Sequence, residues 1–145
     1  LGRRACAHGS CIALALLGNF FLAIAAEQPD GSSLPLVVST LVRDAMQLHD
    51  AWLKAAFIFV LVGYGTKMGL APLHTWLPDA HSEAPSMVSA LLSGALLNCA
   101  FLGILRMQQV CVAAGYAAFG QDLLIGFGLL SMAVAAVFLQ GQTDY

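Results

Sequence analysis

The sequence predicts an all-α fold, a polytopic bundle of transmembrane helices. Hydrophobic residues make up 59% of the 145 residues, charged residues only 10%, and the mean hydropathy is +0.81. Soluble domains rarely have this composition. Four apolar stretches, at about 7–26, 54–80, 86–106 and 122–140, approach or exceed the roughly 20 residues that cross a hydrocarbon core. We therefore expect four membrane spans.

The first span has a competing interpretation as a secretory signal. Arg3 and Arg4 give a basic start, a short apolar run follows, and the residues at 23–25 (Ala-Ile-Ala) resemble a cleavage site. Against this interpretation, the chain begins with Leu1 and the apolar run extends back towards Ala5. We expect a membrane span here.

The segment between the first two spans combines a loop with a periodic stretch. Polar turn residues fill 27–33, which is typical of an exposed loop. Apolar side chains then recur at three- and four-residue spacing from Leu34 to Trp52, with charged residues between them. This pattern predicts an amphipathic helix at 36–53. Such a helix would lie in the membrane interface or form the exposed first turns of the second span.

The second span carries a charge at membrane depth. Lys67 lies in the apolar run 55–71, and the thirteen residues that separate it from Lys54 correspond to ~20 Å of helix. A charge at that depth costs at least ~2.5 kcal/mol, so such residues usually line an ion pathway or meet a buried partner. Lysine can take up and release a proton as its surroundings change. The sequence therefore predicts ion translocation, with a static ion pair that locks two helices as the alternative.

The residues around Lys67 argue against one straight helix. Gly63, Gly65 and Gly69 each weaken a helix, and Pro72 removes an amide donor within one turn of the lysine. We expect a discontinuous span near Lys67–Pro72, with Gly69 and Pro72 at the break. Freed backbone groups need partners in protein or water, so a break beside a charge indicates a hydrated cavity.

Histidines and carboxylates follow the break. His74, Asp79, His81 and Glu83 include metal-ligating types, but the interleaved prolines prevent one helical face from displaying them and no zinc spacing is present. We expect no metal site. His74 and His81 are the candidates for a proton relay, because histidine titrates near neutral pH. Ordinary hydrogen-bonded histidines explain them equally well.

The third span has features of helix packing. Small residues lie four apart, which lets helices approach closely. The pairs are Ala90 with Gly94, and Ser89 with Ser93. The polar Asn98 at mid-depth indicates a hydrogen bond to a neighbouring helix or a contact with a water path.

Other functional classes find little support. The net charge is −2 and the six Lys and Arg are spread along the chain, which excludes a nucleic-acid surface. The cysteines form no CxxC pair and fall in or beside apolar segments, so we interpret them as packed side chains. They are Cys6, Cys11, Cys99 and Cys111. We expect no cofactor.

The segment KMGLAPLHTWLPDAHSEAPSMVSALLSG, residues 67–94, resembles the signature of the antiporter-like membrane subunits. These are shared by respiratory complex I, Mrp cation/proton antiporters and membrane-bound hydrogenases. LLSG at the end of the segment is most similar to the formate hydrogenlyase and group 4 hydrogenase branch. The resemblance implies more than a dozen transmembrane helices in two inverted repeats, and proton transfer through buried lysines and a glutamate. Lys67 matches the lysine of the first discontinuous helix.

The resemblance also implies partners and a location. It places the protein in a bacterial or archaeal cytoplasmic membrane, beside other membrane-arm subunits and a peripheral redox arm that carries the electron transfer. The amino end and the region of His74 would face the cytoplasm. An Mrp-type sodium/proton antiporter subunit and a structural scaffold with a static Lys67 ion pair are the alternatives.

Two departures from the family pattern affect these expectations. Ser93 stands where many complex I and Mrp members have a histidine, which puts the usual lysine-to-histidine relay in doubt. The glutamate that pairs with the lysine would lie before Leu1, and the lysine of the second repeat would lie after Tyr145. We therefore expect an internal fragment that does not translocate protons alone.

Overall fold

The computed structural model describes residues 2–27, 33–70 and 84–140, and the side chains of the first helix from Ile12 onward. The predicted all-α fold is confirmed: apart from one isolated bridge between Glu27 and Ser33, the described residues contain no β-structure. In chain order the elements are α1 (Gly2–Ala25), α2 (Val38–Arg43), the 3₁₀ turn η1 (Ala45–Gln47), α3 (Asp50–Met68), α5 (Ser86–Leu91), the π-helical turn η2 (Leu92–Leu96), α6 (Leu97–Ala113) and α7 (Ala117–Gln140).

Three of these helices are long and apolar enough to cross a membrane. They are α3, the continuous helix Ser86–Ala113 formed by α5, η2 and α6, and α7. α1 adds a shorter apolar stretch at Ile12–Ala25. The helix that ends at Ala113 runs past the expected limit at 106. Within it, the Arg106 guanidinium donates a 3.2 Å hydrogen bond to the Gln109 side-chain oxygen. The expected span at 54–80 reaches residues outside the described ones.

The segment expected as one amphipathic helix at 36–53 is divided into α2, η1 and the start of α3. The chain leaves helical geometry at Leu48, where φ is −73° and ψ is 142°. The apolar positions Leu41, Ala45 and Leu48 are nevertheless buried against the bundle, as their spacing indicates. The His49 amide donates a 3.1 Å hydrogen bond to the Ala25 carbonyl, which ties this segment to the end of α1.

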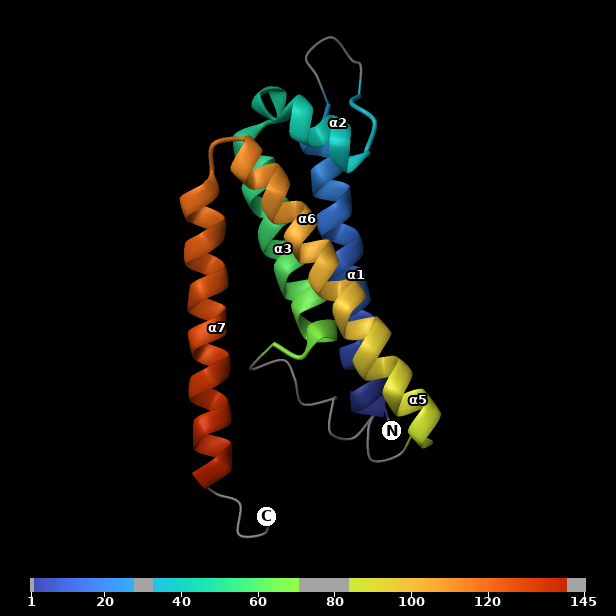
Figure 1. The fold of residues 1–145 in the computed structure, drawn as a ribbon. Helices are drawn as coiled ribbons and strands as arrows, with labels where there is room; N and C mark the ends of the chain where they lie inside the picture. The colour runs from blue at the N-terminus through green and yellow to red at the C-terminus, as the bar shows by residue number, and fades with distance from the viewer. Residues whose placement is uncertain (1, 28–32, 71–83, 141–145) are drawn as a thin grey trace.

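α1 and α3 run antiparallel and approach closely through glycine (Figure 1). A Cβ atom on Gly63 would lie 2.5 Å from the Ala15 amide nitrogen, and one on Gly18 would lie 2.8 Å from the Val60 amide nitrogen. Backbone meets backbone at both points, so neither position has room for a side chain. On the third span, a Cβ built on Gly94 would meet no described atom within 4 Å beyond its own turn of helix, and the small-residue contact expected there stays a prediction.

α6 lies against the next face of α3 and completes the core. The largest side chains with less than 2% exposure are Phe57, Leu41, Leu53, Leu61, Ile104, Val110 and Cys111. α7 lies to the side of this three-helix unit (Figure 1). Its first turns contact the core through Phe119, Leu123, Leu124 and Phe127, whereas the rest of the helix is mostly exposed. The core of the described residues is therefore built by α1, α3 and α6.

Candidate functional site

Lys67 lies in the last turn of α3 and is half-buried. The neighbouring positions on α3 define the faces around it: Gly63 lies against Ala15 of α1, and the Tyr64 ring lies 3.5 Å from a Cβ built on Gly103 of α6. Helical geometry places Lys67 about 40° from Gly63 and about 60° from Tyr64 around the axis. The lysine therefore lies at the seam between the α1-facing and α6-facing sides of α3.

The helix that carries Lys67 ends immediately after it, at Met68. Gly69 has φ +87°, in the left-handed region that favours glycine. Its amide donates to the Thr66 carbonyl at 3.4 Å, and the Leu70 amide donates to the Gly65 carbonyl at 2.8 Å. This pair of hydrogen bonds is a Schellman motif. The helix thus ends at the expected glycine, Gly69, while Pro72 lies outside the described residues and the discontinuous span stays a prediction.

We expect Gly69→Ala to destabilise the protein by about 1 kcal/mol or more, because alanine is strained in the left-handed region. Thermal inactivation of the purified full-length protein would measure this effect. Gly126→Ala in α7 is the matched control, since the added Cβ meets no described atom within 4 Å and the residue is helical. Equal stability of the two variants would show that the cap at Gly69 contributes nothing.

Thr66, next to the lysine, is a buried polar residue that sequence reasoning missed. It is only 3% exposed, and its hydroxyl donates a 2.7 Å hydrogen bond to the Gly63 carbonyl. This bond to the preceding turn lets a hydroxyl lie inside an apolar core. There was little sign of this in the sequence, because the Thr66 hydroxyl bonds to a carbonyl of its own helix and needs no polar residue elsewhere in the chain.

His74 and His81 both lie outside the described residues, so their relation to the lysine stays a prediction. Among residues 2–27, 33–70 and 84–140, no group of three His, Cys, Asp or Glu could hold a metal ion. Ser93 lies exposed in η2.

η2 is a second feature that the sequence did not indicate. Residues Leu92–Leu96 form a π-helical turn inside an otherwise regular helix. Asn98 donates a 2.6 Å hydrogen bond to the Gly94 carbonyl in the same helix, instead of reaching a neighbouring helix. Single π turns occur frequently at functional sites. The turn and the amide thus lie in the first half of the continuous helix Ser86–Ala113.

A polar cluster marks the opposite end of α3. Lys54 Nζ lies 4.1 Å from the centre of the Tyr116 ring, and the Tyr116 hydroxyl is hydrogen-bonded to Asp50. This hydrogen bond is the main cause that raises the pKa of Tyr116 above its usual value. The cluster joins the first turn of α3 to the turn before α7, where Gly115 has φ +86°.

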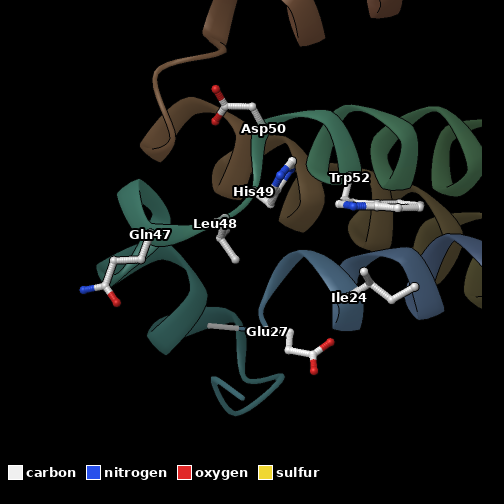
Figure 2. Close-up of a pocket in the computed structure, with 7 residues that line it drawn as sticks. All are labelled: Ile24, Glu27, Gln47, Leu48, His49, Asp50 and Trp52. Atoms are coloured by element: carbon white, nitrogen blue, oxygen red, sulfur yellow. The ribbon is translucent and has the colours of Figure 1, made fainter. Parts of the chain in front are cut away.

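A pocket of about 610 Å³ lies beside this cluster (Figure 2). Its lining residues are Ile24, Glu27, Gln47, Leu48, His49, Asp50 and Trp52. Figure 2 shows the carboxylates of Glu27 and Asp50 on opposite sides of the group. The pocket lies at the opposite end of α3 from Lys67, so the two ends of this helix hold separate sets of ionisable side chains.

The described helices are those of a multi-pass helical membrane protein. The ionisable Lys67 lies at the end of one of its membrane-length helices. Within the class of multi-pass membrane proteins, residues 9–145 match the family model "NADH:quinone oxidoreductase/Mrp antiporter, TM". The chain belongs to this family, which confirms the resemblance carried by residues 67–94.

Curated relatives come from both the hydrogenase and the quinone oxidoreductase branches. The chain is 44% identical over 137 residues to a "Hydrogenase-4 component F homolog" of Methylacidiphilum infernorum, covering 94% of this chain and 29% of the relative. It is 39% identical to an "NAD(P)H-quinone oxidoreductase chain 4 1" of Picosynechococcus (61% and 16% covered). It is 36% identical to "Hydrogenase-4 component B" of Escherichia coli (63% and 13% covered). The chain thus spans less than a third of these relatives, and no solved structure matches it.

Proposed function

We propose that this chain is part of a proton-translocating, antiporter-like subunit of a hydrogenase or complex I-like assembly, and that Lys67 carries the proton. The observation that supports this proposal most directly is the position of Lys67. It is half-buried at the end of a membrane-length helix, within a chain that matches the family over residues 9–145.

The proposed mechanism is electrostatic. Lys67 lies in the last turn of α3, where the last carbonyls of the helix carry partial negative charge. In this proposal, the lysine passes on its proton when a nearby positive charge arrives and receives another when that charge leaves. His74 and His81 are our candidates for the delivery of protons to this site.

The redox chemistry belongs, in this proposal, to other subunits. Relatives of the chain are named as components of hydrogenases and quinone oxidoreductases. We propose neighbouring membrane-arm subunits and a peripheral redox arm as partners, in the cytoplasmic membrane of a bacterium or archaeon. Electron transfer in that arm would change the electrostatic potential along the membrane subunits, and this change would drive proton binding and release at Lys67.

A second candidate is a sodium/proton antiporter subunit of the Mrp type, because the matching family model includes these antiporters. The two candidates differ in the ion on which transport depends. A coupled proton pump needs an electron donor, whereas an antiporter needs a sodium gradient.

We expect inverted membrane vesicles that contain the full-length protein in its complex to take up protons when the electron donor is added. Uptake should be the same with sodium and with potassium as the only alkali cation. Vesicles from cells that lack the subunit are the control. Proton movement that follows a sodium gradient without any donor would favour the antiporter, and donor oxidation without proton movement would favour a scaffold.

A further inference from the structure

The pocket beside the first turn of α3 has a fixed backbone frame. The His49 amide donates a 3.1 Å hydrogen bond to the Ala25 carbonyl. The Leu34 amide donates a 3.0 Å hydrogen bond to the Ala26 carbonyl. These bonds join the segments before and after α2 to the end of α1, where Ala25 and Ala26 are 0% and 1% exposed. The pocket of about 610 Å³ is therefore preformed, as ligand sites usually are.

The charge of this pocket favours a cation. Its lining holds the carboxylates of Glu27 and Asp50, and no lysine or arginine is among the lining residues that the structure describes. Lys54 follows Asp50 by one turn, but its ammonium lies 4.1 Å from the centre of the Tyr116 ring, which is outside the lining. A cleft lined by one sign of charge attracts ligands of the opposite sign. The ligand therefore carries a positive group.

The pocket also offers donors to an anionic group. Figure 2 shows His49 and Trp52 between the two carboxylates in this view. An imidazole and an indole N–H can each donate a hydrogen bond. A metal ion fits poorly, because the described residues hold no group of three His, Cys, Asp or Glu that could bind one. The lining instead matches a zwitterion that carries an ammonium group and an anionic oxygen.

Three aromatic rings lead from the pocket along the surface of α1 and α3. Phe21 of α1 contacts both Trp52 and Phe59 of α3, with 5.4 Å and 5.2 Å between ring centres. We call these three residues the aromatic row. Trp52 is 39% exposed, and Phe20, next to Phe21, is 61% exposed. Tryptophan is enriched where the membrane meets water, so the row places the pocket at the interface and continues to the depth of the acyl chains.

We propose that this pocket binds one aminophospholipid of the phosphatidylethanolamine class. The primary ammonium of its headgroup lies at Glu27 and is attracted also by the negative charge of Asp50. The phosphate oxygens accept hydrogen bonds from His49 and Trp52, and an acyl chain follows the aromatic row. A soluble amine would use only the carboxylates and leave the aromatic row uncovered. The inference goes beyond the proposed function and does not depend on it, because none of these residues lies near Lys67.

The test compares two lipids that differ only in the headgroup amine. Dioleoyl phosphatidylethanolamine and dioleoyl phosphatidylcholine are offered in equal amounts to the purified, delipidated full-length protein, and native mass spectrometry measures which lipid is retained. The ethanolamine ammonium donates hydrogen bonds, whereas the quaternary choline ammonium has no hydrogen to donate. We expect a preference of about tenfold for the ethanolamine lipid, the effect of one hydrogen bond to a charged group.

Three variants locate the site. Glu27→Gln changes an exposed side chain, so the protein should fold, and it should reduce the preference towards equal binding of the two lipids. Trp52→Leu should weaken the retention of both lipids, because it shortens the aromatic row. Asp122→Asn is the matched control: it neutralises an exposed carboxylate of α7 outside the pocket, and it should bind like the wild type.

Two results would overturn the site: equal binding of the two lipids by the wild type, or a full preference retained by Glu27→Gln. Glycerophosphoethanolamine, the headgroup without acyl chains, distinguishes a lipid from a soluble amine. If it binds as tightly as the whole lipid, the lipid is overturned as the occupant, and much weaker binding supports it. The test measures no proton uptake, so its failure leaves the proposed function standing.

Discussion

Proton uptake should fall by at least about 100-fold when Lys67 is replaced by methionine, while electron transfer by the assembled complex continues. Methionine has a similar length and no titratable group, so it removes the proton-carrying nitrogen and fills its space. The measurement is the ratio of proton uptake to donor oxidation in inverted vesicles, with variant and wild type compared at equal amounts of assembled complex.

Lys67→Arg separates a proton carrier from a static ion pair. Arginine keeps the positive charge and can form an ion pair, but it does not release its proton at accessible pH. A carrier therefore loses proton uptake in both variants. If Lys67 only locks two helices, Lys67→Arg assembles and pumps like the wild type, and Lys67→Met lowers the amount of complex instead. Unchanged pumping in both variants would leave the lysine without a role in transport.

The second large effect is expected at Gly63. An alanine there would place its Cβ 2.5 Å from the Ala15 amide nitrogen and 2.7 Å from its Cα. Backbone atoms cannot rotate out of the way as a flexible side chain can, so α1 must move away from α3. We expect Gly63→Ala to lower stability by about 1–3 kcal/mol, the usual range for overpacking. The amount of folded full-length protein in membranes and its inactivation temperature would measure this.

Gly103→Ala provides the matched control for Gly63→Ala. Its Cβ would lie 3.5 Å from the Tyr64 ring, which is an ordinary van der Waals contact. This variant also adds one methyl group at a contact of α3, so any general effect of the glycine-to-alanine change appears in both proteins. Equal stability of the two variants would show that the α1–α3 approach is looser than the structure indicates.

The two predictions are connected because Gly63 and Lys67 lie one turn apart on α3. A displacement of α1 from Gly63 changes the surroundings of the lysine as well as the packing. We therefore expect the Gly63→Ala protein that does assemble to pump less per electron transferred than Gly103→Ala.

The end of α3 was predictable because its causes are local. Glycines near Lys67 and the proline after it indicated a break, and the structure ends the helix at Met68 with Gly69 in the left-handed region. The amphipathic segment before α3 shows the limit of such reasoning. Its spacing indicated which side is buried, but the turn at Leu48 follows from the connection to the end of α1, which periodicity does not reveal.

Helix contacts were harder to predict than helix positions. The spacing of Ala90 and Gly94 indicated close packing in the third span, but it did not indicate the close backbone approach that the structure has at Gly18 and Gly63. Small residues permit contact wherever they occur, and only the relative placement of the helices decides which of them are used. The π turn at Leu92–Leu96 also has no spacing signal in the sequence.

The sequence by itself determined the membrane class and the position of Lys67 beside a helix end, because hydropathy and backbone stiffness act over a few neighbouring residues. The family followed from the resemblance carried by residues 67–94. Only the tertiary structure decided that Lys67 lies at the α1–α6 seam, that Gly63 lies against Ala15, and that Leu61 and Ile104 are buried in one core. In apolar helices every face looks alike in the sequence. Which faces meet depends on contacts between segments that lie far apart in the chain.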